Sequence, residues 1–458
     1  MKLNLIIRTF LARHLTPARI FVLSFATLIG LGTLVLWLPC SASVSKNHLC
    51  FVDALFTAAS AVCVTGLASI DIGKDLSLTG QLVTLVLFQV GGLGIITFSL
   101  VLFALMGRGI SFKGREIVQS TFMQSPRRDF LLILVRVIRY SFIIEAVGVL
   151  LLFSRFIFDF PVSEALYYAV YHAVSAFNNC GYSLFSDNFV RYQSDILVNI
   201  TIMILIVLGG IGFVVLHELM SKFRGKQKEL SLHSKIVLIT TAALILAGTV
   251  CFYFLETNNI LRGASMKTAV LVSLFQAVTP RTAGFNTVDI GMLTNSTILI
   301  IMLLMFIGAS PGSTGGGVKT TSFSLLLLLM INRLKGNENV NVANRTIPKE
   351  LIEKTVSIVF ASAMVIGVII AVLLLAGENN VAPLGYRHQF IEYAFETFSA
   401  FGTVGLSMGV TPKLNDFQKY AIALMMFIGR VGPLTLAFAW YSVRKKRITY
   451  AEESVMVG

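Results

Sequence analysis

Four short uncharged segments, each ending in glycine, carry the backbone groups that could bind an ion. Glycine permits a positive φ and a close approach of backbone to ligand, so a strand of carbonyl oxygens can be aimed at one axis there. Rings of such carbonyls replace the hydration shell of a cation in selective pores. Because no carboxylate lies in any segment, carbonyl dipoles would select, which favours a large monovalent cation over a divalent one. The segments are Val64–Thr65–Gly66, Asn179–Cys180–Gly181, Thr282–Ala283–Gly284 and Thr403–Val404–Gly405.

Arg430 is a lone charge in the apolar stretch AIALMMFIGRVGPLTLAF. We expect it to lie in the middle of a membrane helix, far from either end, where a charge is costly and is usually functional or paired. One interpretation places this positive charge in the pore, just below the four segments, as a barrier to cations. The other is a structural ion pair, for which Glu145 is the candidate partner.

A glycine-rich stretch from Gly308 to Thr320 interrupts another apolar segment. So many glycines and a proline cannot continue a helix. We expect a flexible loop inside the membrane that swings across the pore as a gate; the alternative is a static kink that lets helices pack. The candidate gate residues are Gly312, Ser313, Thr314, Gly315, Gly316, Gly317 and Lys319, together with Arg430.

The composition of the chain indicates that lipid surrounds these residues. Of 458 residues, 55% are hydrophobic and 13% are charged, whereas soluble domains carry about 25% charged residues. Nearly uncharged runs such as Ile20–Leu38 and Ile358–Leu375 are as long as the roughly 20 residues that span a bilayer as a helix. We therefore expect a polytopic, all-α membrane protein.

The net charge of +14 reflects topology and does not predict nucleic-acid binding, because the basic residues gather between apolar runs. Positive residues mark cytoplasmic loops, so both termini and three loops are expected in the cytoplasm. These residues are Arg8, Arg13 and Arg19; Arg108, Lys113, Arg115, Arg127 and Arg128; Lys222, Arg224, Lys226, Lys228 and Lys235; Arg333, Lys335, Arg345, Lys349 and Lys354; and Arg444, Lys445, Lys446 and Arg447.

The three basic loops divide the chain into four blocks, each of which must enter and leave the membrane on the cytoplasmic side. We set the blocks at residues 1–110, 111–222, 223–335 and 336–458. In each, a long apolar helix (M1) precedes a short segment, a tip glycine and a second apolar helix (M2). The short segments, too short to span, are predicted to be re-entrant pore helices at Val52–Cys63, Ser163–Asn178, Lys267–Thr279 and Gln389–Phe401.

A second glycine marker recurs in phase with the tips, at Gly91, Gly209, Gly308 and Gly429, 24 to 28 residues after each tip glycine. Two markers in register across four blocks of the same orientation indicate parallel repeats about an axis along the membrane normal. A four-fold arrangement would gather the tips into one pore. The C-terminal ends of the pore helices, the negative ends of their dipoles, would then point at a passing cation.

Patterns for catalysis or a bound cofactor are missing from the sequence. The glycine-rich stretch fails as a phosphate loop, since Val318 stands where lysine is required. The five cysteines show no metal-ligand spacing, and no paired carboxylates or Ser/His pair suits an intramembrane enzyme. We predict no enzymatic activity and no cofactor in this chain. A secondary solute–cation symporter is the alternative function, although such proteins usually contain inverted repeats.

The four M1–pore helix–M2 blocks, the single tip glycines and the broken third M2 resemble the Trk/Ktr/HKT superfamily of potassium transporters, and most of all the Ktr membrane subunit. The resemblance implies K⁺ uptake, often dependent on Na⁺, by a homodimer in the bacterial plasma membrane. It further implies a cytosolic ring of RCK-type regulatory subunits, which alone bind nucleotide, and a barrier role for Arg430. Only Thr403–Val404–Gly405 keeps a strict TVG, although all four glycines that the family associates with potassium preference are present.

Overall fold

The computed structural model describes residues 17–44, 46, 48–94, 130–225, 227–377 and 383–440. The first basic loop, with Arg108, Lys113, Arg115, Arg127 and Arg128, lies outside the described residues. So do Arg8, Arg13, Lys226 and the basic C-terminal residues Arg444, Lys445, Lys446 and Arg447. The described part is mostly helical, with one short hairpin of β1 (Asn341–Val342) and β2 (Arg345–Thr346).

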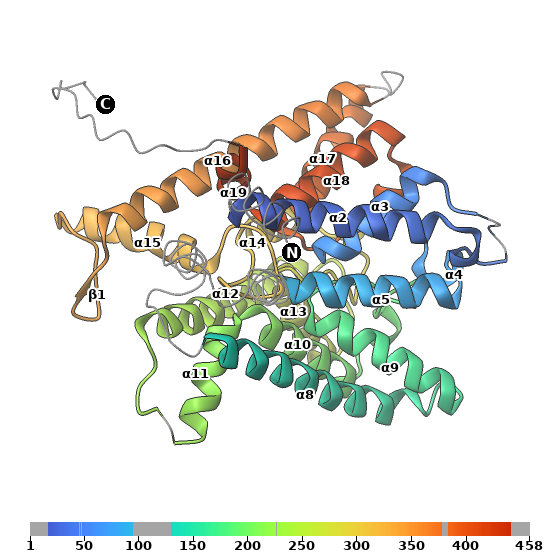
Figure 1. The fold of residues 1–458 in the computed structure, drawn as a ribbon, viewed down its shortest axis with the longest axis horizontal. Helices are drawn as coiled ribbons and strands as arrows, with labels where there is room; N and C mark the ends of the chain where they lie inside the picture. The colour runs from blue at the N-terminus through green and yellow to red at the C-terminus, as the bar shows by residue number, and fades with distance from the viewer. Residues whose placement is uncertain are drawn as a thin grey trace, which may run out of the picture.

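The chain forms four successive units that share one layout, in which a helix of 21 to 28 residues is followed by a shorter helix and then by M2, whose first helix has 12 to 16 residues (Figure 1). The first unit contains α2 (Pro17–Trp37), α3 (Phe51–Cys63), the single turn α4 (Ile72–Asp75) and α5 (Leu78–Gly92). The second contains α8 (Phe130–Phe156), α9 (Val162–Phe177), α10 (Ile196–Gly210) and α11 (Phe213–Phe223).

The third unit contains α12 (Leu232–Glu256), α13 (Met266–Val278), α14 (Asn295–Phe306) and α15 (Thr320–Leu334). The fourth contains α16 (Lys349–Ala376), α17 (Pro383–Gly402), α18 (Asp416–Val431) and α19 (Pro433–Trp440). Helices α3, α9 and α13 coincide closely with the first three predicted pore helices, whereas α17 begins at Pro383, six residues before the predicted start at Gln389. Short 3₁₀ turns complete the loops at Pro39–Ser41, Val190–Tyr192, Ile290–Met292 and Thr411–Lys413.

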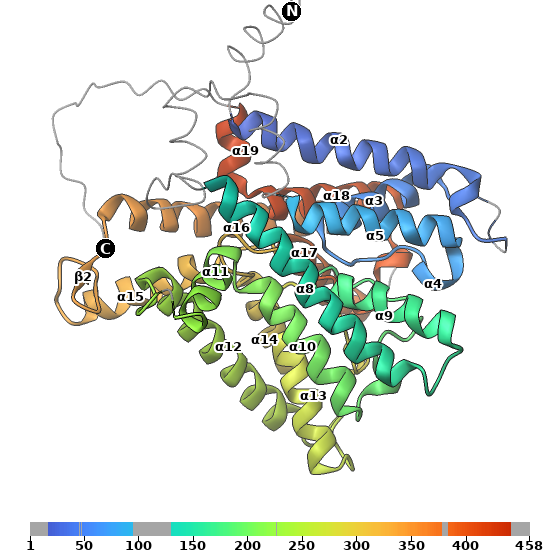
Figure 2. The same ribbon diagram turned by 60° about the horizontal axis from the view of Figure 1, so that its bottom comes forward.

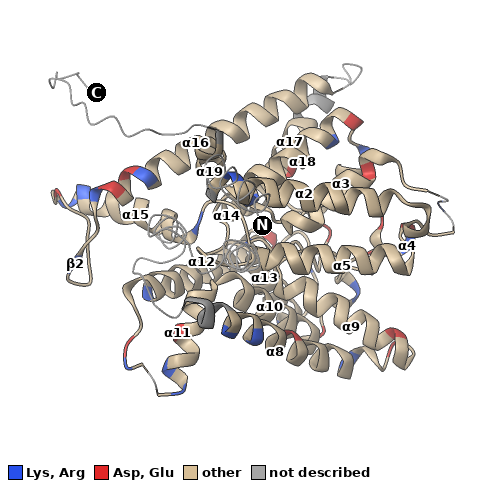
Figure 3. Ribbon diagram, viewed as in Figure 1, with Lys and Arg blue, Asp and Glu red and all other residues tan. Residues whose placement is uncertain are grey.

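Each unit begins with a helix long and apolar enough to cross a membrane, at Ala18–Trp37, Val135–Phe156, Leu232–Glu256 and Lys349–Ala376. Figures 1 and 2 show α2, α8 and α16 running in the same direction, as parallel repeats require. Lys, Arg, Asp and Glu residues lie mainly near helix ends and in the connecting loops, while the ribbon of the long helices is mostly tan, the colour of the other residues (Figure 3). The fold is therefore a polytopic all-α membrane architecture of four parallel repeats.

Polar caps fix where the first helix of M2 begins in each unit. A side-chain oxygen immediately before α5, α10, α14 and α18 accepts a hydrogen bond from a backbone N–H of the first turn, which satisfies a donor that the helix itself leaves unpaired. Asn415 and Gln418 form a reciprocal capping box at α18. The four capping residues are Ser77, Asp195, Thr294 and Asn415.

The four units close into a ring. Each M2 helix packs against the pore helix of the next unit: α5 against α9, α10 against α13, and α14 against α17. The last M2, α18, packs against the first pore helix, α3. Because this series returns to its start, the four units surround one common axis in chain order, which is the pseudo-four-fold arrangement predicted from the sequence.

The third M2 is interrupted, as the glycine-rich stretch predicts, and the M2 segments of the second and fourth units are bent as well. The α10–α11 pair bends by 106° and the α18–α19 pair by 89°. Each bend coincides with a glycine at positive φ, Gly212 at 93° and Gly432 at 89°, a conformation that ends a right-handed helix. In the third unit, residues 307–319 separate α14 from α15.

Candidate ion pore

The four tip glycines meet at the centre of the ring. A Cβ atom at any of them would overlap the backbone carbonyl oxygen of the residue that precedes the next tip glycine. Gly66 approaches the carbonyl of Cys180, Gly181 that of Ala283, Gly284 that of Val404, and Gly405 that of Thr65. The contacts run around the ring in the order of the repeats. The structure thus brings all four predicted segments together and leaves no room there for a side chain.

The same backbone conformation recurs in every segment. Each tip glycine has a positive φ, between 76° and 94°. The residue two positions earlier also has a positive φ, although it is not glycine: Val64 at 58°, Asn179 at 60°, Thr282 at 79° and Thr403 at 50°. Such conformations are strained for these residue types and persist only where the surroundings impose them. Because the same strained turn occurs four times, the surrounding structure must impose this backbone conformation at each tip.

Serines at the ends of three pore helices support this backbone, a role that our sequence analysis did not identify. The carbonyls of Ser60, Ser175 and Ser399 each accept a 2.8 Å hydrogen bond from the N–H one residue before the tip glycine. The hydroxyls of Ser60 and Ser399 also accept from the tip glycine N–H, at 3.1 and 3.0 Å. The signal was a serine six positions before three of the four tips.

The third segment is built differently. The N–H of Ala283, the residue before the tip glycine Gly284, donates to the carbonyl of Thr279 at 2.9 Å. The side chains of Asn179 and Thr282 are hydrogen-bonded at 3.1 Å, which joins the second and third segments. The four-fold symmetry of the ring is therefore approximate at the level of single hydrogen bonds.

The second glycine marker has a packing role. At Gly91, Gly209 and Gly429, an added Cβ would overlap the carbonyl oxygen of Val62, Phe177 or Phe401, respectively. Each of these carbonyls lies four residues before a tip glycine, so M2 passes directly against the C-terminal turn of its own pore helix. Gly308 instead approaches Gly316, because the third M2 gives way to the glycine-rich loop.

The glycine-rich loop lies against the segments and reaches the neighbouring repeats. The Gly316 N–H donates to the Thr403 hydroxyl at 2.9 Å, and the Thr314 hydroxyl donates to the Gly209 carbonyl at 3.2 Å. Ser313, Thr314, Gly315 and Gly316 are buried. The loop thus contacts α10 of the second repeat and the tip of the fourth at the same time.

Lys319 and Gly312 fasten the two ends of the loop. The Lys319 ammonium donates to the Gly315 carbonyl at 2.8 Å and lies 3.4 Å from that of Gly316. The Gly312 carbonyl accepts from the Phe213 N–H at 2.8 Å, and the Gly317 N–H donates to the Gly429 carbonyl at 3.3 Å. These bonds hold one defined conformation of the loop beneath the tips.

Arg430 links the loop to the first repeat, and its position differs from the prediction. It lies in the last turn of α18, not in the middle of a helix, because α18 ends at Val431 where Gly432 bends the chain. Its guanidinium donates to the carbonyls of Thr314 and, at 2.5 Å, of Gly91. The side chain is 6% exposed, and its Nε atom has no hydrogen-bond partner.

Glu145, the candidate ion-pair partner of Arg430 under the structural alternative, binds other residues. The Glu145 carboxylate accepts hydrogen bonds from the Gln89 amide at 3.1 and 3.2 Å and from the Asn178 amide at 3.2 Å. Among the described residues, no carboxylate forms an ion pair with Arg430. The positive charge next to the loop is therefore held by neutral carbonyl oxygens and by the negative end of the α18 dipole.

Comparison with known proteins places this arrangement in a family. A family model described as TrkH, cation transport protein, matches residues 15–443. The chain belongs to the TrkH family of cation transport proteins. It is 39% identical to the Ktr system potassium uptake protein B of Bacillus subtilis over 446 residues, with 97% of each chain covered. It is 34% identical to the protein of the same description from Vibrio alginolyticus, over 96% of this chain and 94% of the relative.

Two further proteins resemble this member of the TrkH family, one in sequence and one in fold. The potassium/sodium uptake protein NtpJ of Enterococcus hirae is 33% identical, over 97% of this chain and 98% of the relative. The crystal structure of the potassium transporter TrkH from Vibrio parahaemolyticus superposes with a TM-score of 0.71 at 18% identity, covering 93% of this chain and 85% of that one. At that identity the superposition shows a shared fold.

Proposed function

We propose that this chain is the ion-translocating subunit of a potassium uptake system. The observation that carries the proposal is the closed ring of four tip glycines, each in contact with the carbonyl before the next. Relatives that match nearly the whole chain are described as potassium uptake proteins, which supports potassium as the ion. Transport, not catalysis, is the proposed activity.

The proposed filter consists of the twelve residues of the four segments. The ring is crowded by the carbonyls of Thr65, Cys180, Ala283 and Val404, and backbone carbonyls can replace the hydration shell of K⁺. The C-terminal ends of four pore helices converge behind them, which adds a negative potential. No carboxylate lies in a segment, so the site suits a monovalent cation.

The proposed gate is the loop from Gly312 to Lys319 together with Arg430. The loop joins three repeats beneath the tips, and Arg430 fixes its Thr314 carbonyl to the end of α5. The Arg430 guanidinium binds neutral carbonyls and has no carboxylate partner among the described residues, and in a low-dielectric environment such an uncompensated charge repels a cation strongly. Flux would then require the loop and Arg430 to move aside together.

The finer features rest on the pattern of basic loops, for the orientation and the repeat boundaries, and on the family resemblance for the rest. We propose a multi-pass bacterial plasma-membrane protein with cytoplasmic termini, divided into repeats at residues 1–110, 111–222, 223–335 and 336–458. It would form a homodimer on a cytosolic RCK-type ring that carries the nucleotide. Dependence on Na⁺ is suggested by the description of the Enterococcus relative as a potassium/sodium uptake protein.

Flux measurements in proteoliposomes test the proposed function. Vesicles that contain the purified protein should dissipate a K⁺ gradient and take up Rb⁺, and Na⁺ and Li⁺ should compete only weakly with that uptake. Expression of the chain should restore growth of an uptake-deficient strain at low K⁺. Equal permeation of K⁺ and Na⁺ would contradict the filter. Accumulation of an organic solute driven by a cation gradient would favour the symporter alternative instead.

A further inference from the structure

The residue that follows each tip glycine is buried, and one of these four residues carries a polar group. They are Leu67, Tyr182, Phe285 and Leu406, each with an exposed fraction of 1% or less. Tyr182 therefore places a hydroxyl among apolar side chains, directly after a proposed filter segment. Because a buried hydroxyl is costly unless it is hydrogen-bonded, the partners of this one indicate its role.

The Tyr182 hydroxyl reaches from the second repeat into the first. It lies 3.2 Å from the carbonyl oxygen of Thr57 and 3.3 Å from that of Leu67, so that its single hydrogen is shared between two acceptors. Thr57 belongs to the pore helix α3, and Leu67 is the counterpart of Tyr182 in the first repeat. The side chain thus connects the outer ends of the first and second segments.

Hydroxyl groups hold the carbonyl after the tip glycine in the second and third repeats, and there the donor comes from the same repeat. The Ser175 hydroxyl donates to the Tyr182 carbonyl at 2.8 Å, and the Thr279 hydroxyl donates to the Phe285 carbonyl at 2.5 Å. Both donors lie at the C-terminal end of their pore helix. Such a bond fixes the orientation of the peptide group that follows the tip.

The first repeat obtains the equivalent bond from its neighbour. The corresponding hydroxyl of its pore helix, that of Ser60, accepts a hydrogen bond from the Gly66 N–H at 3.1 Å. The Leu67 carbonyl accepts from the Tyr182 hydroxyl of the second repeat. Tyr182 therefore provides in the first repeat what a serine and a threonine provide within the second and third.

The backbone next to Tyr182 is a firm support for this contact. The Nε2 atom of His172, on the pore helix α9, lies 3.0 Å from the Ser183 hydroxyl and accepts from the Leu184 N–H at 3.3 Å. The Tyr182 carbonyl is held by Ser175 of the same helix. Three successive residues after the second tip are thus bonded to one buried helix.

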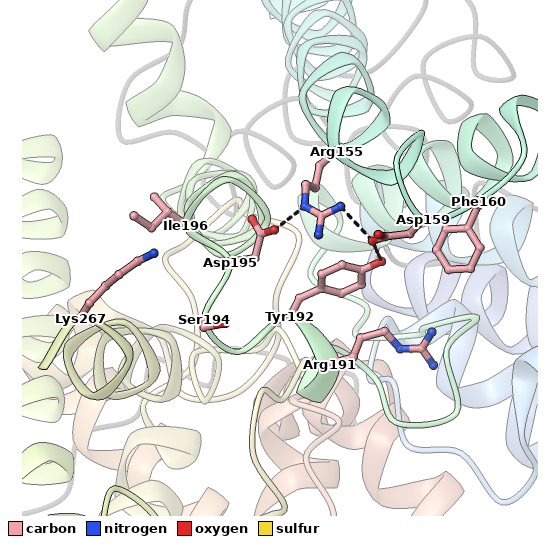
Figure 4. A pocket seen from close by; sticks show the side chains of 9 residues that line it. All are labelled: Arg155, Asp159, Phe160, Arg191, Tyr192, Ser194, Asp195, Ile196 and Lys267. Carbon is pink, nitrogen blue, oxygen red and sulfur yellow. Dashed lines mark hydrogen bonds and ion pairs between the residues drawn. The ribbon is translucent and has the colours of Figure 1, made fainter. Parts of the chain in front are cut away.

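Charged groups fasten the far end of the same outer loop (Figure 4). Arg155, in the last turn of α8, donates to Asp159 at 2.9 Å and to Asp195 at 2.5 Å. Asp159 also accepts from the Tyr192 hydroxyl at 2.8 Å. Because the loop is bonded to α9 at its start and to α8 at its end, Tyr182 is attached to a fixed part of the second repeat.

The first segment transmits a shift of Leu67 to the proposed filter. Leu67 directly follows Gly66, and a Cβ atom on Gly66 would overlap the Cys180 carbonyl oxygen and lie 3.3 Å from the Gly181 Cα atom. The two segments are therefore in backbone contact at the tips. A filter of carbonyls discriminates between ions by its size or by the arrangement of its dipoles, and a displaced Leu67 would change both.

We propose that the Tyr182 hydroxyl is a specificity-determining group, which holds the outer end of the first segment at the position that favours K⁺ over Na⁺. Tyr182 is a positioning residue, since it acts through the Leu67 carbonyl. The inference rests on the proposed function, because it takes the four segments as a potassium filter. It assigns to one hydroxyl group a share of the selectivity that the proposed function attributes to the segments.

Tyr182→Phe tests the inference, because it removes the hydroxyl and keeps the ring. The measurement is the ratio of the initial rates of Rb⁺ and Na⁺ uptake into proteoliposomes that contain the full-length chain. The ratio should fall about two- to fivefold, since one hydrogen bond contributes about 1 kcal/mol net, which corresponds to about fivefold in a ratio of rates. Rb⁺ uptake itself should stay close to that of the unmodified chain.

Tyr171→Phe is the matched control. Tyr171 is also a fully buried tyrosine of the second repeat, and its hydroxyl is also bonded to the first repeat, at 2.9 Å from that of Thr84. This bond joins the pore helix α9 to the M2 helix α5 and does not involve a residue next to a tip glycine. Tyr171→Phe should therefore leave the uptake ratio unchanged.

The possible outcomes separate this inference from the proposed function. An unchanged ratio for Tyr182→Phe, in a chain whose unmodified form prefers Rb⁺, would overturn the inference and leave the proposed function intact. Equal uptake of Rb⁺ and Na⁺ by the unmodified chain would contradict the filter itself, and the inference with it. A similar loss with Tyr171→Phe would show that any hydroxyl between these repeats has the same effect. A lowered melting temperature and lowered Rb⁺ uptake at an unchanged ratio would assign Tyr182 a purely structural role.

Discussion

At the scale of single residues, the tip glycines combine two requirements that no other residue meets. Gly181 has a φ of 78°, and a Cβ there would lie 2.5 Å from the Ala283 carbonyl oxygen and 2.8 Å from the Gly284 Cα. A side chain would therefore be strained by its own backbone and would also push the third segment away from the axis. The damage should extend beyond the substituted segment.

Gly181→Ser should lower Rb⁺ flux per molecule at least about tenfold, as expected if only a little over 1 kcal/mol is added to the barrier. Proteoliposome uptake measures it. Gly263→Ser is the matched control, because Gly263 has nearly the same φ, 79°, but nothing within 4 Å of an added Cβ. If Gly263→Ser impaired flux as severely, backbone strain alone would account for the effect, and the crowding argument would fail.

Arg430 should behave as a barrier rather than as a structural cation. Arg430→Ala removes the charge beside the loop, and K⁺ flux should rise several-fold, since each 1.36 kcal/mol taken off a barrier is about a tenfold gain in rate. Arg281→Ala is the control: Arg281 is equally buried, at 6% exposure, but its guanidinium donates a hydrogen bond to Thr241 of α12, whereas that of Arg430 donates to Thr314 of the loop. Unchanged flux with a lowered melting temperature for Arg430→Ala would instead indicate a structural role.

At the scale of elements, the glycine-rich loop is held by few side chains. Lys319 donates to two loop carbonyls from the residue before α15. Lys319→Gln shortens the side chain and removes its charge, so the loop should lose its fastening and flux should increase. Lys335→Gln, at the other end of α15 and exposed to solvent, should leave flux unchanged. A decrease in flux with Lys319→Gln would mean that the fastened loop is the conducting form.

Deletion of Ser313–Gly317 tests the whole loop. These five residues hold the contacts to Gly209 and Thr403, so their removal should leave a pore that no longer closes, seen as K⁺ leak from loaded vesicles without any activator. Tight and regulated transport after the deletion would rule out the gate. A preserved melting temperature shows that the remaining ring has folded.

Much of the fold could be predicted from the sequence, because hydropathy, the positions of basic loops and the regular spacing of glycines can be read directly along the chain. The pore helices α3, α9 and α13 lie within one residue of their predicted ends. The bends at Gly212 and Gly432 were missed, since an isolated glycine is common in membrane helices and its φ depends on packing. The place of Arg430 in the last turn of α18 was missed for the same reason.

The candidate site was predicted less completely. The tip glycines are recognisable from their spacing, but the Ser60 and Ser399 hydroxyl bonds depend on how the chain turns back on itself. The network of Glu145, Gln89 and Asn178 joins three elements far apart in the sequence. The folded chain brings them together, so residue types alone could offer Arg430 as a candidate partner but could not identify Gln89 and Asn178.

At the scale of the whole molecule, one chain contains the complete ring, because α18 packs against α3. In a homodimer each chain should then conduct independently. Vesicles with mixed populations of the unmodified chain and an inactive Gly181→Ser chain should show flux proportional to the unmodified fraction. A steeper loss, approaching the square of that fraction, would indicate a pore shared between two chains and would contradict the closed ring.

The closed ring within one polypeptide also has an evolutionary consequence. In a pore of four identical subunits, each codon change alters all four quarters at once. Here a codon change at Cys180 or Ala283 alters one quarter of the ring and leaves the other three unchanged. If the ring is the proposed filter, its selectivity could be adjusted in small steps, and the four quarters are free to diverge, as the differing residues before the four tip glycines already have.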